Sequence, residues 1–377
     1  MKEGWEYKTL GECCDILNGY PFKSSLYSNS GIRVIRITNV QKGYVIDSNP
    51  KYYPESKITE ISNFILKNED ILISLTGNVG RVAILQKEFL PAALNQRVAC
   101  LRIKDMIVNK KFLFFYLNND LFEKLCIKNS TGAAQLNMST DWLKKQIIPI
   151  PSYNEQRRIV SYLDSSFKLI DEIKNKALKS LTEAKALFQS ALAEAMEPKE
   201  GWEEKTLPDI SDNLDNLRKP VTKNKREKGI YPYYGASGIV DYVSNYLIND
   251  KVLLISEDGA NLIARSTPIA FSVSGKIWVN NHAHILKFSD MNTQLFVEYY
   301  FSSINIEEYV TGAAQPKLTQ KNLNKIIIPY PPLPTQKLIV SRLDKLSSKV
   351  RAIEEKYQKM VEECDALKQA MLRDVFE

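Results

Sequence analysis

The sequence predicts an α+β protein in which two mixed α/β domains are separated by two long helices. The helices are expected to form an antiparallel coiled coil, and an internal duplication is expected to give the chain pseudo-twofold symmetry. Three observations predict this fold: the sequence repeats itself, each copy ends in a long helical stretch, and each helix follows a block with prominent strand patterns. The expected segments are residues 1–151 (domain), 152–198 (helix), 199–332 (domain) and 333–377 (helix).

The repeat is read from short motifs that occur twice. KEGWEYKTL at residues 2–10 returns as KEGWEEKTL at 199–207, and TGAAQ at 131–135 returns at 311–315. The 180-residue offset of TGAAQ holds to the end of the chain, so that Gln156 matches Gln336. The opening motif has an offset of 197, which places a 17-residue difference before TGAAQ. Self-similarity of this kind indicates two copies of one unit, each with a variable block and a block of constant length.

Two long helices are predicted after the Pro-rich turns IIPIPSYNEQ and IIPYPPLPTQ. Ser152 and Glu155 fit a capping box, and Thr335 fits an N-cap. After each turn, apolar residues recur at alternating spacings of three and four residues, and the stretch contains no Gly or Pro. Each predicted helix is therefore roughly 60–65 Å long. The predicted stripe comprises Ile159, Leu163, Ser166, Ile170, Ile173, Ala177, Ser180, Ala184, Leu187 and Ala191, and then Ile339, Leu343, Leu346, Val350, Ile353, Tyr357, Met360, Cys364, Leu367 and Met371. We expect the two stripes to pair, with the globular blocks at opposite ends of a rigid spacer.

The variable blocks carry strand patterns. Ile32–Val40 alternates apolar and polar residues, and Ile71–Leu75 and Val82–Leu85 flank a turn with two glycines. The corresponding pattern in the second half is Val252–Ser256, followed by Glu257, Asp258 and Gly259. We therefore expect the two blocks to share a fold and to differ in their loops.

Composition indicates a water-soluble cytoplasmic protein. Hydrophobic residues make up 44% and charged residues 25% of the chain, and no apolar run has the length of a membrane span or a signal peptide. The five cysteines are odd in number and lack a CxxC pair, which favours reduced thiols. Net charge is +6 for residues 1–151 but −1 for 200–332, so charge alone supports a polyanionic partner only for the first block.

Motifs for chemistry are not found, and we expect a chain without catalytic residues, metal or cofactor. The sequence has no GxxxxGK[ST] phosphate loop and no Asp/Asn-Pro-Pro-aromatic tetrapeptide of the kind found in adenosylmethionine pockets. His282 and His284 would share one strand face, but they have no acidic or cysteine neighbour in sequence to complete a metal site. Glu257 and Asp258 are interpreted as part of a glycine turn rather than as a catalytic pair.

The chain combines four features: duplicated GW…KTL starts, TGAAQ loops, I-P-x-P…Q helix starts and two long helices. Together they resemble the specificity subunit of Type I restriction–modification systems. The resemblance covers essentially the whole chain. It implies two target-recognition domains that each read one half of a bipartite double-stranded DNA site, with the helices setting the spacer. It also implies partners: two methyltransferase subunits and two restriction endonuclease–translocase subunits. S-adenosylmethionine, ATP and Mg²⁺ would be used by those subunits and not by this chain.

Candidate DNA contacts follow from comparing the two copies, because base-reading side chains are expected to differ between copies while framework contacts persist. Arg suits guanine, and Asn or Gln suits adenine. The candidate readers are Asn78, Arg81, Gln96 and Arg97 in the first copy and Asn261, Arg265, Asn281 and His282 in the second. In an equally open reading, Asn95 and Asn280 satisfy buried backbone and their neighbours merely face water.

The identical TGAAQ loops are assigned to the framework. Gly132 and Gly312 would let the backbone approach phosphates or brace the helix start, and Gln135 and Gln315 would organise the loop, although direct adenine reading by Gln stays open. Phosphate contacts that position the DNA without specifying it are expected from basic side chains. These are Lys110, Lys111, Lys223, Lys225, Arg226 and Lys228, and Lys317 is a further candidate DNA contact.

Two other functions remain open from the sequence alone. A cytoplasmic scaffold would use its two divergent domains to bind protein partners across the coiled coil. An enzyme with an unfamiliar active site would show activity on DNA without any partner. Salt dependence separates DNA binding from protein binding, because phosphate contacts weaken steeply as salt rises.

Overall fold

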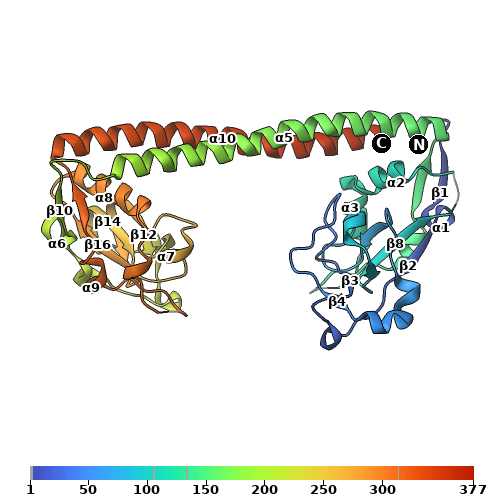
Figure 1. Ribbon diagram of the computed structural model, residues 1–377, viewed down its shortest axis with the longest axis horizontal. Helices are drawn as coiled ribbons and strands as arrows, with labels where there is room; N and C mark the ends of the chain where they lie inside the picture. The colour runs from blue at the N-terminus through green and yellow to red at the C-terminus, as the bar shows by residue number, and fades with distance from the viewer. Residues whose placement is uncertain (1–2, 105–106, 133–134, 313) are drawn as a thin grey trace. The chain divides into compact units, whose positions relative to one another are not determined.

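The computed structural model describes residues 3–104, 107–132, 135–312 and 314–377, which divide into two compact units. Unit 1 comprises Met1–Ala177 with Lys359–Glu377, and unit 2 comprises Leu178–Gln358. Each unit contains one mixed domain and part of each long helix, α5 (Tyr153–Met196) and α10 (Leu333–Phe376) (Figure 1). Domain 1 is the part of the chain before α5, and domain 2 is the part between α5 and α10. Within the described ranges, no helix has the length and apolar character needed to cross a membrane.

Domain 1 is built on two small sheets. The first has the order β2-β8-β5-β6 and is antiparallel, and the second has the order β4-β3-β7 with β3 and β7 parallel. The strands are β2 (Cys14–Asn18), β3 (Ile32–Ile35), β4 (Tyr52–Tyr53), β5 (Ile71–Ser74), β6 (Val82–Ile84), β7 (Ala92–Leu94) and β8 (Val98–Ile103). The helices are α1 (Leu10–Cys13), α2 (Lys110–Leu117), α3 (Asp120–Lys128) and α4 (Thr140–Lys144). A separate pair, β1 (Glu6–Thr9) with β9 (Ile147–Ile150), closes the domain next to α5.

Domain 2 has one six-stranded sheet with the order β11-β16-β14-β15-β12-β13, in which β12 and β15 are parallel. The strands are β11 (Asp212–Asn213), β12 (Lys228–Gly235), β13 (Gly238–Val243), β14 (Ile248–Ser256), β15 (Ala270–Val279) and β16 (Ala283–Lys287). The helices are α6 (Leu207–Ile210), α7 (Asn261–Ala264), α8 (Met291–Ser303) and α9 (Gln320–Leu323). The closing pair is β10 (Glu203–Lys205) with β17 (Ile328–Tyr330).

The repeated KTL motif starts the same structure in both domains. Thr9 and Thr206 each form a capping box, with Glu12 and Asp209 respectively, at a one-turn helix. The following leucines, Leu10 and Leu207, are buried in the domain cores. The motif is therefore conserved between the copies because it caps a helix and anchors a closing strand to the core.

One predicted strand is shorter than expected. The alternation over Ile32–Val40 predicts a strand of nine residues, but β3 ends at Ile35. The reason is Asn39, whose buried side chain accepts from the Arg36 amide (2.9 Å) and donates to the Ile46 carbonyl (2.9 Å). This local hydrogen bonding stabilises a turn in place of further strand pairing.

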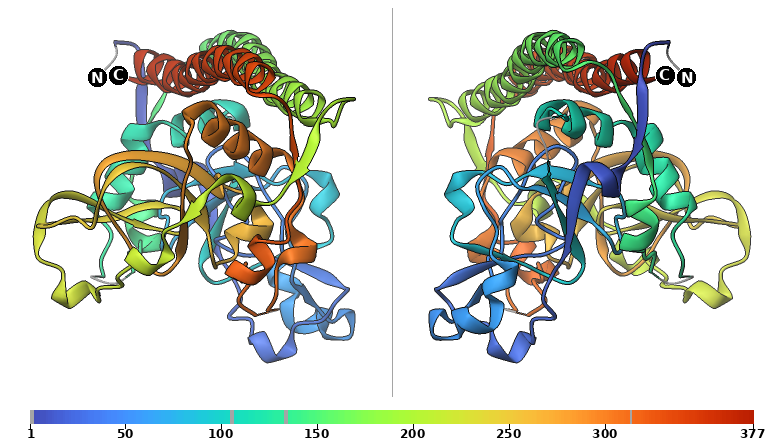
Figure 2. Two further views of the ribbon diagram at one scale, coloured as in Figure 1. Left: turned by 90° about the vertical axis from the view of Figure 1, so that its left-hand side faces the viewer. Right: turned by 90° about the vertical axis from the view of Figure 1, so that its right-hand side faces the viewer.

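The two long helices pack antiparallel, as the repeat predicts, and both views of Figure 2 show them side by side. In unit 1, Asp171 pairs with Lys368 and Lys174 with Asp365, both at 2.6 Å. In unit 2, Lys185 lies 3.9 Å from Glu354. The Lys174–Asp365 and Glu354–Lys185 pairs are related by the 180-residue offset of the sequence. The helix pair therefore carries the duplication in its contacts as well as in its sequence.

The predicted apolar stripe is only partly buried. Leu163, Ile170, Ala177 and Ala184, seven residues apart, form the buried seam of α5. Four stripe residues that were expected in the seam are largely exposed instead: Ile173 (49%), Leu187 (60%), Ile353 (38%) and Leu367 (51%). Two helices bury only a narrow seam, so these positions lie on its open side.

Each helix is fixed to its domain by a buried glutamine. Gln156 accepts from the Asn109 amide (2.7 Å) and donates to the Ile107 and Pro151 carbonyls (2.9 Å each). Gln336 accepts from the Thr293 hydroxyl and donates to the Pro331 carbonyl, both at 2.8 Å. The glutamine of the I-P-x-P…Q pattern thus joins the first turn of each long helix to the domain that precedes it.

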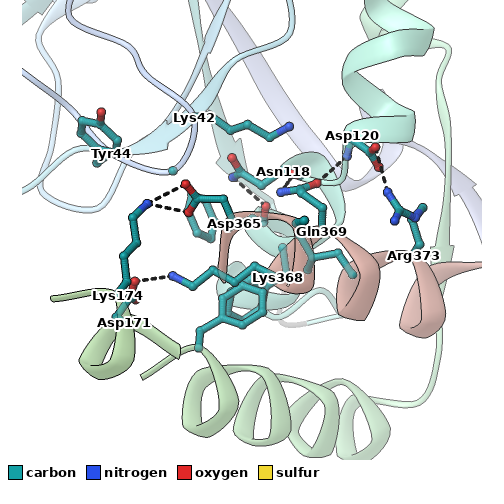
Figure 3. A pocket seen from close by; sticks show the side chains of 16 residues that line it. Lys42, Tyr44, Asn118, Asp120, Asp171, Lys174, Asp365, Lys368, Gln369 and Arg373 are labelled. Carbon is teal, nitrogen blue, oxygen red and sulfur yellow. Dashed lines mark hydrogen bonds and ion pairs between the residues drawn. The ribbon is translucent and has the colours of Figure 1, made fainter. Parts of the chain in front are cut away.

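A groove of about 900 Å³ lies where domain 1 meets the helix pair in unit 1 (Figure 3). Phe114, Phe115 and Phe167 form its apolar wall. At its rim, Gln369 accepts from the Asp120 amide (2.9 Å) and Arg373 pairs with the Asp120 carboxylate (2.9 Å). The end of α10 is therefore fixed to domain 1 by polar contacts around an aromatic wall.

Candidate nucleic-acid interface

Three segments meet in each domain: the end of the central strand, the turn before the next strand, and the TGAAQ loop. In domain 1, the Leu75 amide donates to the Arg97 carbonyl (2.9 Å), and the Met138 amide donates to the Leu75 carbonyl (2.8 Å). In domain 2, the Glu257 amide donates to the His282 carbonyl (2.9 Å), and the Leu318 amide donates to the Glu257 carbonyl (2.7 Å). The same hydrogen bonds thus place Arg97 and His282 at equivalent positions.

Asn95 and Asn280 hold the turn that carries these residues. Both are buried, and their side-chain oxygens accept from the amides of Arg97 (3.1 Å) and His282 (2.8 Å). The asparagines are thus part of the framework, as one of the two sequence interpretations has it. The residues beside them, Gln96 and Asn281, are exposed.

The TGAAQ loops are closed by a bridge between Thr131 and Asn137 in domain 1 and between Thr311 and Lys317 in domain 2. Gly132 and Gly312 have φ of +111° and +88°. A Cβ atom at these positions would lie 2.2 Å and 2.5 Å from the carbonyl oxygens of Gln135 and Gln315, so only glycine fits. The side chains of Gln135 and Gln315 are exposed, and Ala133, Ala134 and Ala313 lie outside the described residues.

Domain 2 places a charge network directly behind its loops. Glu257 contacts Arg218 and lies 3.1 Å from Lys317, and Arg218 also pairs with Asp215 (3.1 Å). The fully buried His284 contacts Asp215 through Nδ1 (2.6 Å) and the Leu318 carbonyl through Nε2 (2.9 Å). At the equivalent places domain 1 has the apolar Leu75 and Ala99, so the two sites differ in electrostatics.

The second histidine also has a carboxylate partner. His282 Nδ1 lies 2.8 Å from Asp258 Oδ2, at the exposed end of the same cluster. Neither pair is evident from the sequence, because Asp258 and Asp215 lie 24 and 69 residues from their histidines. Gly259 with φ of +109° forms the predicted turn after Asp258. Among the described residues, no group of three or more His, Cys, Asp or Glu side chains is arranged to hold a metal ion.

The network makes domain 2 sensitive to acid. Burial would raise the pKa of Asp215 and of Glu257, but His284 and Arg218 at Asp215, and Arg218 and Lys317 at Glu257, hold both pKa values below their ordinary range. A carboxyl with a lowered folded pKa stabilises the fold above its unfolded pKa of about 4, and this stabilisation is lost as pH falls through the folded pKa. We expect the urea midpoint of domain 2, followed by hydrogen exchange of its backbone amides, to fall from about pH 5 downward, and to fall less in Glu257→Gln. Parallel pH profiles in wild type and variant would contradict this assignment.

Several sequence candidates are engaged inside their own domain. The Arg265 guanidinium donates to the Phe301 (2.9 Å) and Ile304 (2.8 Å) carbonyls, and burial lowers its pKa. Asn261 accepts from the Thr267 amide and donates to its carbonyl. Arg226 pairs with Asp241 (3.1 Å) and lies over the Tyr233 ring. These three side chains stabilise loops rather than face solvent.

The Asn78/Arg81 set does not occupy positions equivalent to Asn261/Arg265. The Gly77 and Gly259 amides donate to the carbonyls of Leu136 and Pro316, the residues that follow TGAAQ, which places Asn78 opposite Ala260. Asn78 is exposed, and Arg81 donates to the Gln41 side chain (2.6 Å). Of the basic candidates, Lys110 and Lys111 pair with Glu69 and Asp164, whereas Lys223, Lys225 and Lys228 are exposed.

Comparison with known proteins identifies the family. The Type I restriction modification DNA specificity domain matches residues 2–183 and again residues 199–363. A putative type I restriction enzyme specificity subunit of Haemophilus influenzae is 37% identical over 144 residues, which are 38% of this chain and 37% of that protein. The EcoprrI specificity subunit of Escherichia coli is 24% identical and the match covers 93% of this chain and 89% of that protein.

A solved structure shares the fold. A chain from a study of complex assembly and conformational transition of the type I R-M system has a TM-score of 0.77 and 18% identity, with 100% of this chain and 98% of that chain covered. The predicted α+β fold, with duplicated domains and antiparallel long helices, is confirmed. Because the family's domain matches both halves of the sequence, the chain belongs to the Type I restriction–modification DNA specificity family.

Proposed function

We propose that this chain is the sequence-recognition subunit of a Type I restriction–modification complex. Each domain reads one half of a bipartite DNA site, and the helix pair sets the spacing between the halves. The observation that carries the proposal is a common framework that presents different side chains at equivalent places: Arg97 against His282, Gln96 against Asn281, and Asn137 against Lys317. A framework of this kind suits two domains that read different sequences.

Base reading is assigned to Arg97, Gln96, Asn281 and His282, together with the exposed Asn78. The Arg97 side chain is exposed, and among the described residues only its backbone amide and carbonyl are hydrogen-bonded, so its guanidinium is available for the O6 and N7 atoms of guanine. Lys223, Lys225 and Lys317 are assigned to phosphates, which position the DNA without specifying it. Gly132, Gly312, Gln135 and Gln315 form the loop framework beside them.

Arg97→Ala tests the reading assignment. The variant is expected to lose discrimination at one base pair of one half-site, by about 1–3 kcal/mol, because a bidentate contact to guanine is removed. Lys225→Ala is the matched control: it should weaken binding to all sequences alike and lower the salt slope by about one. Both are measured by DNA binding of the purified chain over a range of salt concentrations. Uniform weakening by Arg97→Ala, with relaxed specificity in Lys225→Ala, would reverse the assignment.

The chemistry is assigned to partner subunits. Two methyltransferase subunits would use S-adenosylmethionine, and two endonuclease–translocase subunits would use ATP and Mg²⁺. Support for two equal methyltransferase sites comes from the exposed apolar residues of the helix pair: Ile173 and Leu367 in unit 1, and Leu187 and Ile353 in unit 2. These residues correspond through the 180-residue offset, so the same kind of surface is offered twice.

A protein-binding scaffold is the alternative function. It would leave DNA binding weak and would not show the steep salt dependence of phosphate contacts. Binding of the purified chain to DNA at low and high salt therefore separates the two functions.

A further inference from the structure

The β12–β13 hairpin of domain 2 exposes large apolar side chains. Ile230 (79%), Ile239 (48%), Val240 (55%) and Tyr242 (51%) are all exposed, and three of them lie on β13, the edge strand of the sheet. A β-bulge contributes to this exposure. Tyr233 pairs with Asp241 and Tyr234 with Ile239, which leaves Val240 as the extra residue. A bulge re-aims side chains and disrupts regular pairing, and here both Ile239 and Val240 face outward.

The hairpin tip is continuous with the reading turn of domain 2. A Cβ atom at Gly235 would lie 3.1 Å from Val240 Cγ1 and 3.4 Å from Asn280 Nδ2, so Gly235 is flanked by both residues. The Asn280 amide donates to the Tyr234 carbonyl (3.1 Å), and the Ser256 hydroxyl donates to the Ala236 carbonyl. The tip is therefore fixed beside the turn that carries Asn281 and His282.

Exposed positive charge lies along the same hairpin. Arg226 joins the basic loop to Asp241 of β13, which holds Lys223 and Lys225 next to the strand. The Lys219 amide donates to the Val279 carbonyl (3.1 Å), one residue before Asn280. In the part of the chain that the structure describes, Lys219, Lys223 and Lys225 are exposed and form no ion pair within 4 Å.

We propose that the β12–β13 hairpin is a further DNA-reading element of domain 2, with Ile239 and Val240 contacting base edges in the groove. This rests on the proposed function. Apolar side chains distinguish thymine through its methyl group, and lysines beside them hold phosphates in register. The combination of an apolar tip, flanking unpaired lysines and continuity with His282 favours a DNA duplex over a protein partner. At the place equivalent to this hairpin, domain 1 instead has the turn held by Asn39. This difference fits an element that varies with the DNA sequence that each domain reads.

The test is a double variant, Ile239→Ser with Val240→Ser, in the full chain co-expressed with its methyltransferase partner. Methylation sequencing is expected to show a relaxed base position in the half-site that belongs to domain 2, or about tenfold less methylation of the whole bipartite site. The base sequence required in the half-site of domain 1 should be unchanged. Exchange of residues 1–150 for a different domain shows which half of the DNA motif each domain of this chain reads. Ile230→Ser is the control, because it removes an even more exposed apolar side chain at the base of the same hairpin.

The outcomes separate this inference from the function on which it rests. If the wild-type chain directs a bipartite motif and the double variant directs the same motif to the same extent, the hairpin does not read DNA. Loss of all methylation together with loss of methyltransferase co-purification would show a protein contact and would also overturn the inference. If the wild-type chain directs no motif and does not bind DNA in a salt-dependent way, the proposed function itself fails. Circular dichroism confirms that the double variant is folded, as expected for two exposed positions.

Discussion

A seven-residue insertion in each long helix is expected to widen the spacer of the recognised site by about 3 bp. The insertions belong between Lys179 and Ser180 and between Lys359 and Met360, positions related by the 180-residue offset. Seven residues add about 10 Å to a helix, and DNA rises about 3.4 Å per base pair. A heptad also keeps the seven-residue spacing of the seam formed by Leu163, Ile170, Ala177 and Ala184.

The measurement is the methylated motif in cells that carry the insertion variant and its methyltransferase partner. Both half-sites should keep their sequence while the number of bases between them rises. A matched insertion of five residues is the control, because it breaks the heptad and should reduce methylation rather than simply shift the spacer. An unchanged spacer in the heptad variant would show that the helix pair does not set the distance.

Gln336→Ala is expected to destabilise unit 2 by about 2–4 kcal/mol. The side chain is fully buried, and its removal leaves the Thr293 hydroxyl and the Pro331 carbonyl without their partner, in addition to a cavity. The first turn of α10 should then separate more readily from α8. Urea unfolding gives the free energy, and hydrogen exchange should show the loss of protection in α8 and the start of α10.

Two further variants serve as comparisons for Gln336→Ala. Gln156→Ala should produce the same loss in unit 1, since Gln156 joins Asn109, Ile107 and Pro151 in the matching way. Gln320→Ala removes an exposed glutamine and should leave the free energy of unfolding within about 0.5 kcal/mol of wild type. A Gln336→Ala protein as stable as Gln320→Ala would mean that the buried amide is not the joint between helix and domain.

The sequence predicted the parts of the fold that depend on repetition and periodicity. Two copies of KTL and of I-P-x-P…Q mark the places where a helix is capped and where a glutamine is buried, so the duplicated architecture could be read directly. The 3-4 spacing predicted both long helices and their pairing, and the internal repeat predicted that the pairing is antiparallel. The spacing predicted more buried positions in the seam than the structure has. Spacing alone does not show which positions stay exposed when only two helices pack, and these are Ile173, Leu187, Ile353 and Leu367.

The site was predictable only where the two copies match closely. Asn95 and Asn280 share a position, so Gln96/Arg97 and Asn281/His282 were aligned correctly. The match of Arg81 with Arg265 was not supported, because the loops between differ in length and Arg265 is used to bind two backbone carbonyls. The charge network of domain 2 was missed, since most of its pairs, such as Arg218–Glu257 and His284–Asp215, join residues far apart in sequence. The hairpin tip was missed because the β-bulge that contributes to its exposure is not evident from the sequence pattern.

The most direct test of the central claim is methylation sequencing of the host genome with and without this gene. The proposal predicts that one bipartite, adenine-methylated motif disappears when the gene is deleted. It also predicts that only one half of the motif changes when residues 1–150 are exchanged. If every methylated motif persists after deletion while the methyltransferase partner is present and active, the chain does not select the sites that are methylated, and the proposed function is wrong.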